Sequence, residues 1–485
     1  MPRLSSLVLP WLLAGMLLAP AGVHALDPDK AFHHYVSDNW SIEAGLPQIT
    51  VRAMAQDSDG YLWLGTQAGI SRFDGARFAN FDSSNTPELP GDFIHALLAE
   101  DNGRLWIATY KGLALRERDR FTRIEIAEGL ESVTDVVSLA MGRDGRVLAG
   151  TARGIAQVRD GHLHLLHALP ATAQSLLVED THTWAGSIGG VYQFEAGQRR
   201  FMPLPDAASA VVTRLRRAQG RLWAGTGVGL YWLSESGWQR YLDDPALARK
   251  PIEEIFEDSD GNLWISMLDH LLRLRGGRVV ERIEQSPTSI AVRSALEDRE
   301  GNLWLGTQWN GAIRLWNGWT RRYSVREGLR EPILWSVARD PDGHTWVGTE
   351  SGLVRLREGR FEQVLPGDAL PHPTVYTLRV ERERIWIGTR RGAALFEDGK
   401  VLTPELLRPM ASAQINGIVG DSGGALWFAT TQGLFRLQDE QLLRFGEAEG
   451  LHDVRVRFVL ETRDRRLLIG TQGGLFELRE GRFHP

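Results

Sequence analysis

Acidic turns are the residues of this chain whose types and spacing most suggest a site for chemistry. The sequence reads Asp-Ser-Asp-Gly at residues 57–60 and again at 258–261, and closely spaced carboxylates are the ligands that Ca²⁺ prefers. A calcium loop of the EF-hand type also needs a glutamate six residues after its glycine. Thr66 and Met267 stand at that spacing. The pattern favours hairpin turns over calcium sites, and we expect no bound metal.

The same turns are similar to the Asp-box of sialidases, Ser-x-Asp-x-Gly-x-Thr-Trp, but in a different register. The position two before Gly60 is Ser58, and the position two before Gly343 is Pro341. Glycoside hydrolysis also requires a positioned pair of carboxylates, and the sequence does not single one out. Sialidase chemistry is therefore disfavoured.

Histidines offer a second candidate site. His162 and His164 are two residues apart, with His167 close behind, so the first two would face one side of a strand at a spacing that a metal can use. No third ligand can be named, which favours an exposed strand face. The sequence contains no Gly-x-Ser-x-Gly elbow, phosphate-cradling loop or paired zinc motif. We therefore assign no catalytic residue and no cofactor.

The elements that would position any site come from a repeat. The phrase Asp-Gly-x-x-Trp-x-Gly-Thr-x-x-Gly-Leu returns every 36 to 43 residues, and Leu148 and Leu468 fill its tryptophan position in two weaker copies. A repeat of about forty residues is typical of β-propellers. The tryptophans of the other nine copies are Trp63, Trp106, Trp184, Trp223, Trp264, Trp304, Trp346, Trp386 and Trp427.

One copy, residues 332–365, predicts four short strands. An apolar run at 332–339 precedes an Asp-Pro-Asp-Gly turn, and strands follow at 345–349, 353–357 and 360–365. Four strands joined by hairpins form one propeller blade. In each copy we expect the tryptophan to pack between blades and the glycine of Gly-Thr to lie where a side chain would not fit.

Eleven copies exceed the four to eight blades of an ordinary ring. The segment 32–37 resembles an outer strand, which would close a ring by pairing with a late blade. We therefore predict an all-β protein of about eleven four-stranded blades, with a first seven-bladed propeller at 26–330 and a partial second propeller of four blades at 331–485. The last copy stops within its outer strand, so we expect a chain truncated relative to a longer parent or an irregular second ring.

Composition and the N-terminus predict an exported protein. An apolar run after Arg3 and a Val-His-Ala pattern before residue 26 are typical of a signal peptide at 1–25, with an uncleaved anchor as the alternative. The chain has no cysteine, which favours a bacterial periplasm weakly. Its net charge of −6, without a basic run, argues against a nucleic-acid partner.

The repeats resemble the two-component regulator propeller family. The resemblance runs from about residue 31 to 480 and includes an opening Glu-x-Gly-Leu-Pro at 43–47. It implies the periplasmic sensor of a membrane-anchored bacterial receptor whose output is a histidine kinase or a diguanylate cyclase. No kinase or cyclase signature, sandwich domain or later membrane span follows the repeats here, so any such activity would belong elsewhere.

Ligand contacts are expected in the turn between the second and third strands, which lies near the channel axis. Its two residues vary between copies while their flanks stay fixed. Aromatic and charged side chains there suit a small polar ligand, a saccharide or a small acid. The predicted contacts are Tyr110, Lys111, Arg153, Trp309, Asn310, Glu350 and Arg390.

The sequence thus predicts a periplasmic ligand-sensing module of a signal-transduction receptor. Ligand would act by shifting the relation between rings or between protomers, for which a homodimer is one arrangement. A periplasmic propeller enzyme, a lyase or hydrolase with residues gathered from several blades, is the first alternative. A protein-interaction scaffold is the second.

Overall fold

Strands dominate the structure, a computed structural model that describes residues 26–27, 30–127, 130, 135–241, 249–284, 291–318, 320, 323–381 and 384–485. The predicted signal peptide at 1–25 lies outside these residues. The all-β fold is confirmed, because helix in the described chain is confined to six short 3₁₀ segments. These are η1 (Phe32–His34), η2 (Ile42–Ala44), η3 (Val325–Glu327), η4 (Gly367–Ala369), η5 (Glu405–Met410) and η6 (Glu447–Glu449).

The chain divides into two compact units, Met1–Arg321 and Arg322–Pro485. The predicted domain limits, 26–330 and 331–485, fall slightly later in the sequence than this division. Nine four-stranded sheets and one eight-stranded sheet, which joins two blades, give eleven blades among the described residues. Seven blades belong to the first unit and four to the second.

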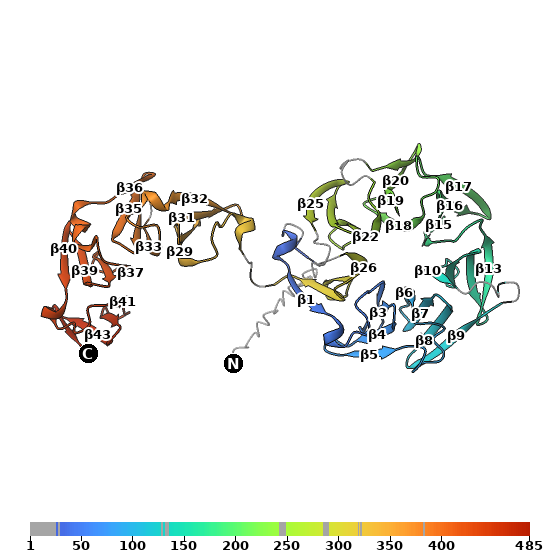
Figure 1. The fold of residues 1–485 in the computed structure, drawn as a ribbon, viewed down its shortest axis with the longest axis horizontal. Helices are drawn as coiled ribbons and strands as arrows, with labels where there is room; N and C mark the ends of the chain where they lie inside the picture. The colour runs from blue at the N-terminus through green and yellow to red at the C-terminus, as the bar shows by residue number, and fades with distance from the viewer. Residues whose placement is uncertain are drawn as a thin grey trace, which may run out of the picture. The chain divides into compact units, whose positions relative to one another are not determined.

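The first unit contains blades 1 to 7. Each blade is an antiparallel four-stranded sheet built around the Trp-x-Gly-Thr strand, and Figure 1 shows the seven arranged in a ring. The strands are, for blade 1, β2 (Ala53–Gln56), β3 (Leu62–Thr66), β4 (Gly69–Phe73) and β5 (Phe78–Phe81); for blade 2, β6 (Ile94–Ala99), β7 (Arg104–Thr109), β8 (Gly112–Glu117) and β9 (Arg120–Ile126); for blade 3, β10 (Val136–Met141), β11 (Val147–Thr151), β12 (Gly154–Arg159) and β13 (His162–Ala168); for blade 4, β14 (Ser175–Val178), β15 (Thr183–Ser187), β16 (Gly190–Glu195) and β17 (Gln198–Pro203); for blade 5, β18 (Val212–Ala218), β19 (Arg221–Thr226), β20 (Gly229–Ser234) and β21 (Gly237–Arg240); for blade 6, β22 (Ile252–Glu257), β23 (Leu263–Met267), β24 (His270–Arg275) and β25 (Arg278–Glu284); and for blade 7, β26 (Val292–Glu297), β27 (Leu303–Thr307), β28 (Ala312–Trp316) and β1 (Val36–Trp40).

The N-terminal strand closes this ring. β1 pairs antiparallel with β28, so the outer strand of the seventh blade comes from the start of the chain. The innermost strand of every blade contacts its two neighbours, and β26 contacts β2 to complete the circle. The outer strand was expected at 32–37, but the structure places it at Val36–Trp40. The difference arises because pairing with β28 sets the register and brings the ring of Trp40 onto that of Trp304.

The second unit contains blades 8 to 11, whose innermost strands contact one another in series from β29 to β41. The four strands predicted from residues 332–365 are present within two residues of their expected limits. The strands are, for blade 8, β29 (Leu334–Arg339), β30 (Thr345–Thr349), β31 (Gly352–Arg357) and β32 (Arg360–Pro366); for blade 9, β33 (Val375–Glu381), β34 (Arg384–Thr389), β35 (Ala393–Glu397) and β36 (Lys400–Leu402); for blade 10, β37 (Ile415–Gly420), β38 (Leu426–Thr430), β39 (Gly433–Gln438) and β40 (Gln441–Phe445); and for blade 11, β41 (Val456–Glu461), β42 (Leu467–Thr471), β43 (Gly474–Arg479) and β44 (Arg482–His484).

Blade packing explains which inner-strand residues are buried. Ile255 on β22 is fully buried between blades of the closed ring, whereas Val337, at the same repeat position of blade 8, is 71% exposed. Phe458 and Leu460 on β41 of blade 11 are likewise exposed. The two end blades of the second unit therefore present apolar side chains that a neighbouring blade covers in the first unit.

In several blades the acidic residue of the turn is part of the packing. One carboxylate oxygen of Asp57 accepts hydrogen bonds from the backbone N–H groups of Asp59 (3.1 Å) and Tyr61 (3.0 Å), and the other accepts one from the indole N–H of Trp63 (2.7 Å). The same acid-to-indole bond recurs six residues apart in other blades. Its pairs are Asp258 with Trp264, Asp298 with Trp304, Asp340 with Trp346, and Asp421 with Trp427. The spacing of acid and tryptophan thus reflects a hairpin that fixes the indole between blades.

The glycine of the Gly-Thr pair lies where blades approach most closely. A Cβ at Gly225 would lie 2.8 Å from Cγ2 of Ile252 and 3.1 Å from its Cβ, on the inner strand of the next blade. Those atoms belong to a buried, β-branched residue that cannot turn aside. The predicted reason for this glycine, lack of room for a side chain, is confirmed at this position.

Gly225→Ala is expected to destabilise the first unit by about 1–3 kcal/mol, the usual cost of overpacking a core. Gly227→Ala, two residues away, provides a matched control, because nothing lies within 4 Å of its Cβ position. That variant should be neutral or slightly more stable, by about 0.4–1 kcal/mol. Denaturant unfolding of both proteins measures the difference, and equal stabilities would contradict the packing argument.

Candidate ligand-binding site

The turns between second and third strands are held rigidly by the conserved phrase of the repeat. In blade 1 the hydroxyl of Thr66 donates to the carbonyl of Gly69 (2.8 Å) and accepts the N–H of Ala68 (3.0 Å). The glycine has a φ of +106°, a left-handed value that other residues rarely adopt. The same threonine contacts recur in blades 2, 3, 5, 8, 9, 10 and 11. The variable residues are therefore carried on a fixed backbone.

Five of the predicted contact residues lie on these turns in the first unit. Tyr110 and Trp309 are 40% and 42% exposed, and the ammonium of Lys111 lies 5.0 Å from the centre of the Tyr110 ring. Arg153 is exposed on the turn of blade 3. Asn310 accepts a hydrogen bond from Asn39 (2.9 Å), next to the ring closure.

The remaining two predicted residues lie in the second unit. Glu350 accepts hydrogen bonds from the indole of Trp335 (2.9 Å) and from the hydroxyl of Thr374 (3.1 Å). The backbone N–H of Arg390 donates to the carbonyl of Thr374 (3.2 Å). These two residues thus share a neighbour, and they belong to a different unit from the other five.

Tyr110 lines a cavity at the mouth of the first ring. This cavity of about 380 Å³ lies between blades 1 and 2 and is also lined by Gln67, Asp92, Phe93 and His95. His95 connects it to the central channel, because the same side chain lines the two channel cavities. Of the seven predicted residues, Tyr110 is the one placed in a described cavity.

The channel mouth is built from one repeat position that sequence reasoning missed. Five blades of the first unit, blades 2, 3, 5, 6 and 7, have an extra residue at the start of the inner strand, seen as a register shift. In blades 1 and 4 the same position directly precedes the residue paired with the Gly-Thr glycine. Such β-bulges re-aim a side chain. We call these seven residues the bulge ring: Arg52, His95, Val137, Gln174, Thr213, Glu253 and Arg293.

The bulge ring lines two adjoining cavities in the channel. All seven residues border a cavity of about 190 Å³. Five of them also border a second cavity of about 310 Å³ that continues along the inner strands past Arg216 and Glu254. Together these spaces reach the size of small-molecule sites, which begin near 300 Å³.

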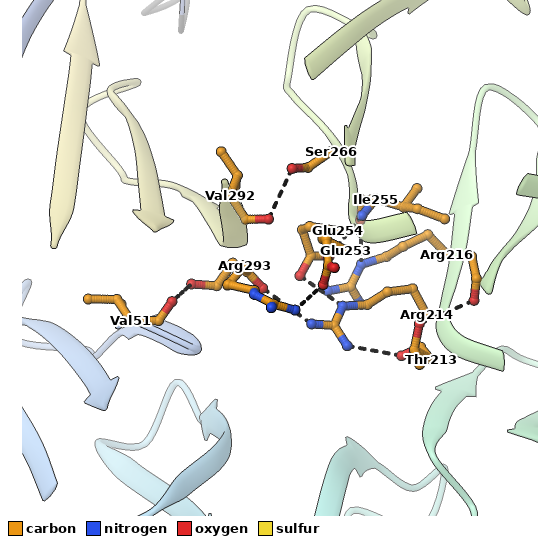
Figure 2. A network of polar contacts seen from close by, with 12 residues as sticks. Val51, Thr213, Arg214, Arg216, Glu253, Glu254, Ile255, Ser266, Val292 and Arg293 are labelled. Carbon is orange, nitrogen blue, oxygen red and sulfur yellow. Dashed lines mark hydrogen bonds and ion pairs between the residues drawn. The ribbon is translucent and has the colours of Figure 1, made fainter. Parts of the chain in front are cut away.

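Charged side chains fill one side of this channel, as Figure 2 shows. Arg293 forms an ion pair with Glu253 and donates to the side-chain oxygen of Gln308 (2.5 Å). Arg214 donates to the carboxylate of Glu254 (3.0 Å) and to the carbonyl oxygens of Thr213 (3.0 Å) and Arg293 (3.2 Å).

The network joins blades 5, 6 and 7, because the strands that carry Arg214, Glu254 and Arg293 belong to those three blades. The Arg216 guanidinium extends it by donating to the carbonyl of Ile255 (3.2 Å). This side of the mouth is therefore fixed by hydrogen bonds before any ligand arrives.

Arg52 lies outside these pairs. Its guanidinium stacks on the ring of Phe93 at 5.0 Å, and its buried Nε has no hydrogen-bond partner. Burial lowers the pKa of Arg52, the guanidiniums of Arg293 and Arg214 lower it further, and Glu253 raises it. Within the channel the charge of Arg52 is thus poorly compensated.

A sequence signal for the bulge ring exists. The ring position lies between an apolar residue and a small one in most blades of the first unit, as in Val51-Arg52-Ala53 and Val292-Arg293-Ser294. Blades 5 and 6 replace the small residue with Arg214 and Glu254, which pair with each other. The sequence contains both the variable ring position and the replacement of the small residue by Arg214 and Glu254. Only the bulge in the structure shows that the side chains at the ring position face the channel.

The other candidate sites take ordinary structural roles. His162 lies on β13, where its Nδ1 is 2.9 Å from the carbonyl of Asp160, and its ring centre is 6.2 Å from that of His164. Ligand atoms of Asp340, Asp342 and His344 lie within 4.8 Å of one another, a spacing that could hold a metal ion. Asp340 already accepts hydrogen bonds from the indole of Trp346 and the backbone of His344.

Within the described residues, the structure contains no helix with the length and apolar character of a membrane span. On the turn of blade 6, hydrogen bonds from His270 and Lys250 lower the pKa of Asp269 to about 2.

Comparison with known protein families gives a match to three stretches of the repeats. A model described as "two component regulator propeller" matches residues 45–68, 88–111 and 286–309. No curated protein matches the chain significantly.

Two solved structures from B. thetaiotaomicron show the same fold. One is the extracellular domain of a protein assigned as a hybrid two component system, with 20% identity and a TM-score of 0.76 over 93% of this chain and 67% of that one. The other is the extracellular domain of a protein assigned as a one component system, with 19% identity and a TM-score of 0.50 over 93% of this chain and 72% of that one. Three repeats of this chain thus match the two component regulator propeller model, and the extracellular domains of two bacterial signalling proteins share its fold.

Proposed function

We propose that this chain is the ligand-sensing propeller portion of an exported bacterial signalling receptor, and that a small polar molecule binds at the channel mouth of its first ring. The bulge ring carries this proposal. Seven blades of a family repeat each place one side chain at a single mouth, and five of those seven side chains are charged or polar amides and imidazoles rather than core residues.

The surroundings of the mouth support binding. Small-molecule sites combine a preformed concave space with a few fixed polar groups and aromatic walls. Here the Arg214–Glu254 pair is fixed by hydrogen bonds, and Phe93 and Tyr110 supply aromatic surface in the adjoining cavity. A binding surface held on paired strands needs little rearrangement to accept ligand.

Such a receptor transmits binding by favouring one of two arrangements of its parts. Its output, a histidine kinase or a diguanylate cyclase as the family resemblance implies, would lie outside these residues. The resemblance of the repeats to that family also supports a periplasmic location for the module.

A binding screen tests this function. Purified protein is titrated with saccharides and small carboxylic acids by thermal shift and calorimetry, and a ligand should raise the melting temperature of the first unit. Tyr110→Ala and Trp309→Ala should each weaken binding about tenfold, or 1.4 kcal/mol. Phe201→Ala removes an equally exposed aromatic ring from the outer strand β17 and should leave binding unchanged.

The proposal fails if no compound binds, or if both turn variants bind ligand like the unmodified protein. Conversion of a bound saccharide by the purified protein would instead favour the propeller enzyme.

A further inference from the structure

We infer that the ligand of the first-ring channel is a small hydroxylated carboxylate, a sugar acid, and that Arg52 binds its carboxylate group. This inference rests on the proposed function and names the chemical class of the ligand. It follows from the charge, the hydrogen bonding and the size of the bulge ring.

The channel has more cations than anions, although the protein as a whole is acidic. Four arginines but only two glutamates line the two cavities within the described chain, in a protein of net charge −6. Charges of one sign in a low-dielectric recess concentrate the opposite ion there. The arginines are Arg52, Arg214, Arg216 and Arg293, and the glutamates are Glu253 and Glu254.

Among the described residues, Arg52 is the channel arginine whose side chain has neither an ion pair nor a hydrogen bond, since Arg216, which also has no ion pair, donates to the carbonyl of Ile255 (3.2 Å). Arg214 and Arg293 each have a glutamate partner, whereas among the described residues Arg52 has no ion pair and its Nε has no acceptor. Arg52 is half-buried, and a charged group that is removed from water is usually paired. Since Arg52 lines both cavities, a bound carboxylate can supply the missing partner, in the two-bonded geometry that a guanidinium favours.

The remaining lining fits a hydroxylated molecule of modest size. Gln174 and Thr213 carry an amide and a hydroxyl at the same mouth, and Tyr110 and Gln67 continue the polar and aromatic surface into the neighbouring cavity. The cavities of about 190 and 310 Å³ hold a single sugar ring rather than a polymer in the channel itself. A compact, highly charged phosphate would leave these neutral groups unused.

A purely structural role for Arg52 makes a different prediction. If Arg52 served only to stack on Phe93, its replacement would destabilise the protein. If Arg52 serves to bind a ligand, Arg52→Gln removes a poorly compensated cation beside Arg214 and Arg293. The protein without added ligand should then melt at the same temperature or higher.

The experiment uses matched acidic and neutral sugars as probes. Glucuronate and galacturonate are titrated against the full chain by calorimetry, with glucose, galactose and inorganic phosphate in parallel. The sugar acids should bind at least tenfold more tightly than the neutral sugars. Arg52→Gln should remove at least tenfold of that affinity, and Arg200→Gln, on the exposed outer strand β17, should not.

Several results would overturn the inference. These are the absence of sugar-acid binding, equal binding of glucose and glucuronate, phosphate binding as tightly as glucuronate, or unchanged affinity in Arg52→Gln. A neutral ligand whose binding depends on Tyr110 would refute the acid class while leaving the proposed sensing function intact. Ligand affinity that stays unchanged when each mouth residue is substituted would refute the proposed function itself.

Discussion

Replacing Asp57 with alanine is expected to destabilise the first unit by about 3–5 kcal/mol, the usual cost of leaving a buried charge without its partner. Asp57 and Arg116 are both almost completely buried, and their side chains lie 3.5 Å apart. The Arg116 guanidinium also lies over the Trp63 ring at 4.6 Å. Removing the carboxylate leaves both this cation and the Trp63 indole N–H without their main acceptor.

The surroundings of Arg116 offer no adequate substitute. Its other carboxylate neighbour, Asp119, is 3.8 Å away and almost fully exposed, where water screens the interaction. Burial lowers the pKa of Arg116 and Asp57 raises it, so loss of Asp57 makes the buried charge still less favourable. Asp57→Asn keeps an acceptor for the indole and should cost less than alanine.

The matched control is Asp59→Ala, which removes an exposed carboxylate from the same turn. Its effect should stay within about 0.5 kcal/mol, as for most surface substitutions. Denaturant unfolding followed by tryptophan fluorescence measures all three variants. If Asp57→Ala were no more harmful than Asp59→Ala, the acid would not fix the indole, and its repetition would need another explanation.

Trp40→Ala should cost the first unit up to about 3–5 kcal/mol, the range for truncating a large aromatic in a core, because Trp40 is partly buried against the core between blades 7 and 1. Trp40 ends the closing strand β1 and stacks on Trp304 of blade 7 at 5.0 Å, and it meets the edge of Phe73 of blade 1 at 5.1 Å. It therefore joins the last blade to the first. Losing it also weakens the pairing of β1 and uncovers the edge of β28.

Trp309→Ala is the control for Trp40→Ala, because Trp309 is an exposed tryptophan of the same blade. It should change the stability by less than about 1 kcal/mol. The closure argument also predicts faster amide hydrogen exchange across β28 in Trp40→Ala, while the second unit, measured by its own exchange rates, stays unaffected. An equal loss of hydrogen-exchange protection in both units would show that Trp40 does not act through closure of the first ring.

The repeat determined the blades because each blade is a local structure. Strand 345–349 and the turn before it depend on residues within one hairpin, and they lie where the sequence predicts. The closing strand lies at Val36–Trp40 and not at the predicted 32–37, because its register depends on β28, which lies far away in the sequence. Pairing partners at that distance leave no mark on local periodicity.

The candidate site was likewise predicted only in part. The sequence identifies the variable turn residues, and one of them, Tyr110, lines a cavity beside the channel. Alternation along an inner strand does not predict that Arg293 faces the channel, because an extra residue redirects its side chain. Arg52 stands at the same repeat position of blade 1. Glu350 and Arg390 share the repeat position of the other predicted contacts, but they lie in the second unit.

The sequence by itself determined the repeat, the blade and the all-β class, because hydrophobic alternation, turn residues and the Asp–Trp spacing act within forty residues. Tertiary structure decided which residues meet. Ring closure turns seven equivalent positions toward one axis, and it places Arg52 beside Arg293 and Arg214, so the charge of the channel is a property of the assembled ring and of no single repeat.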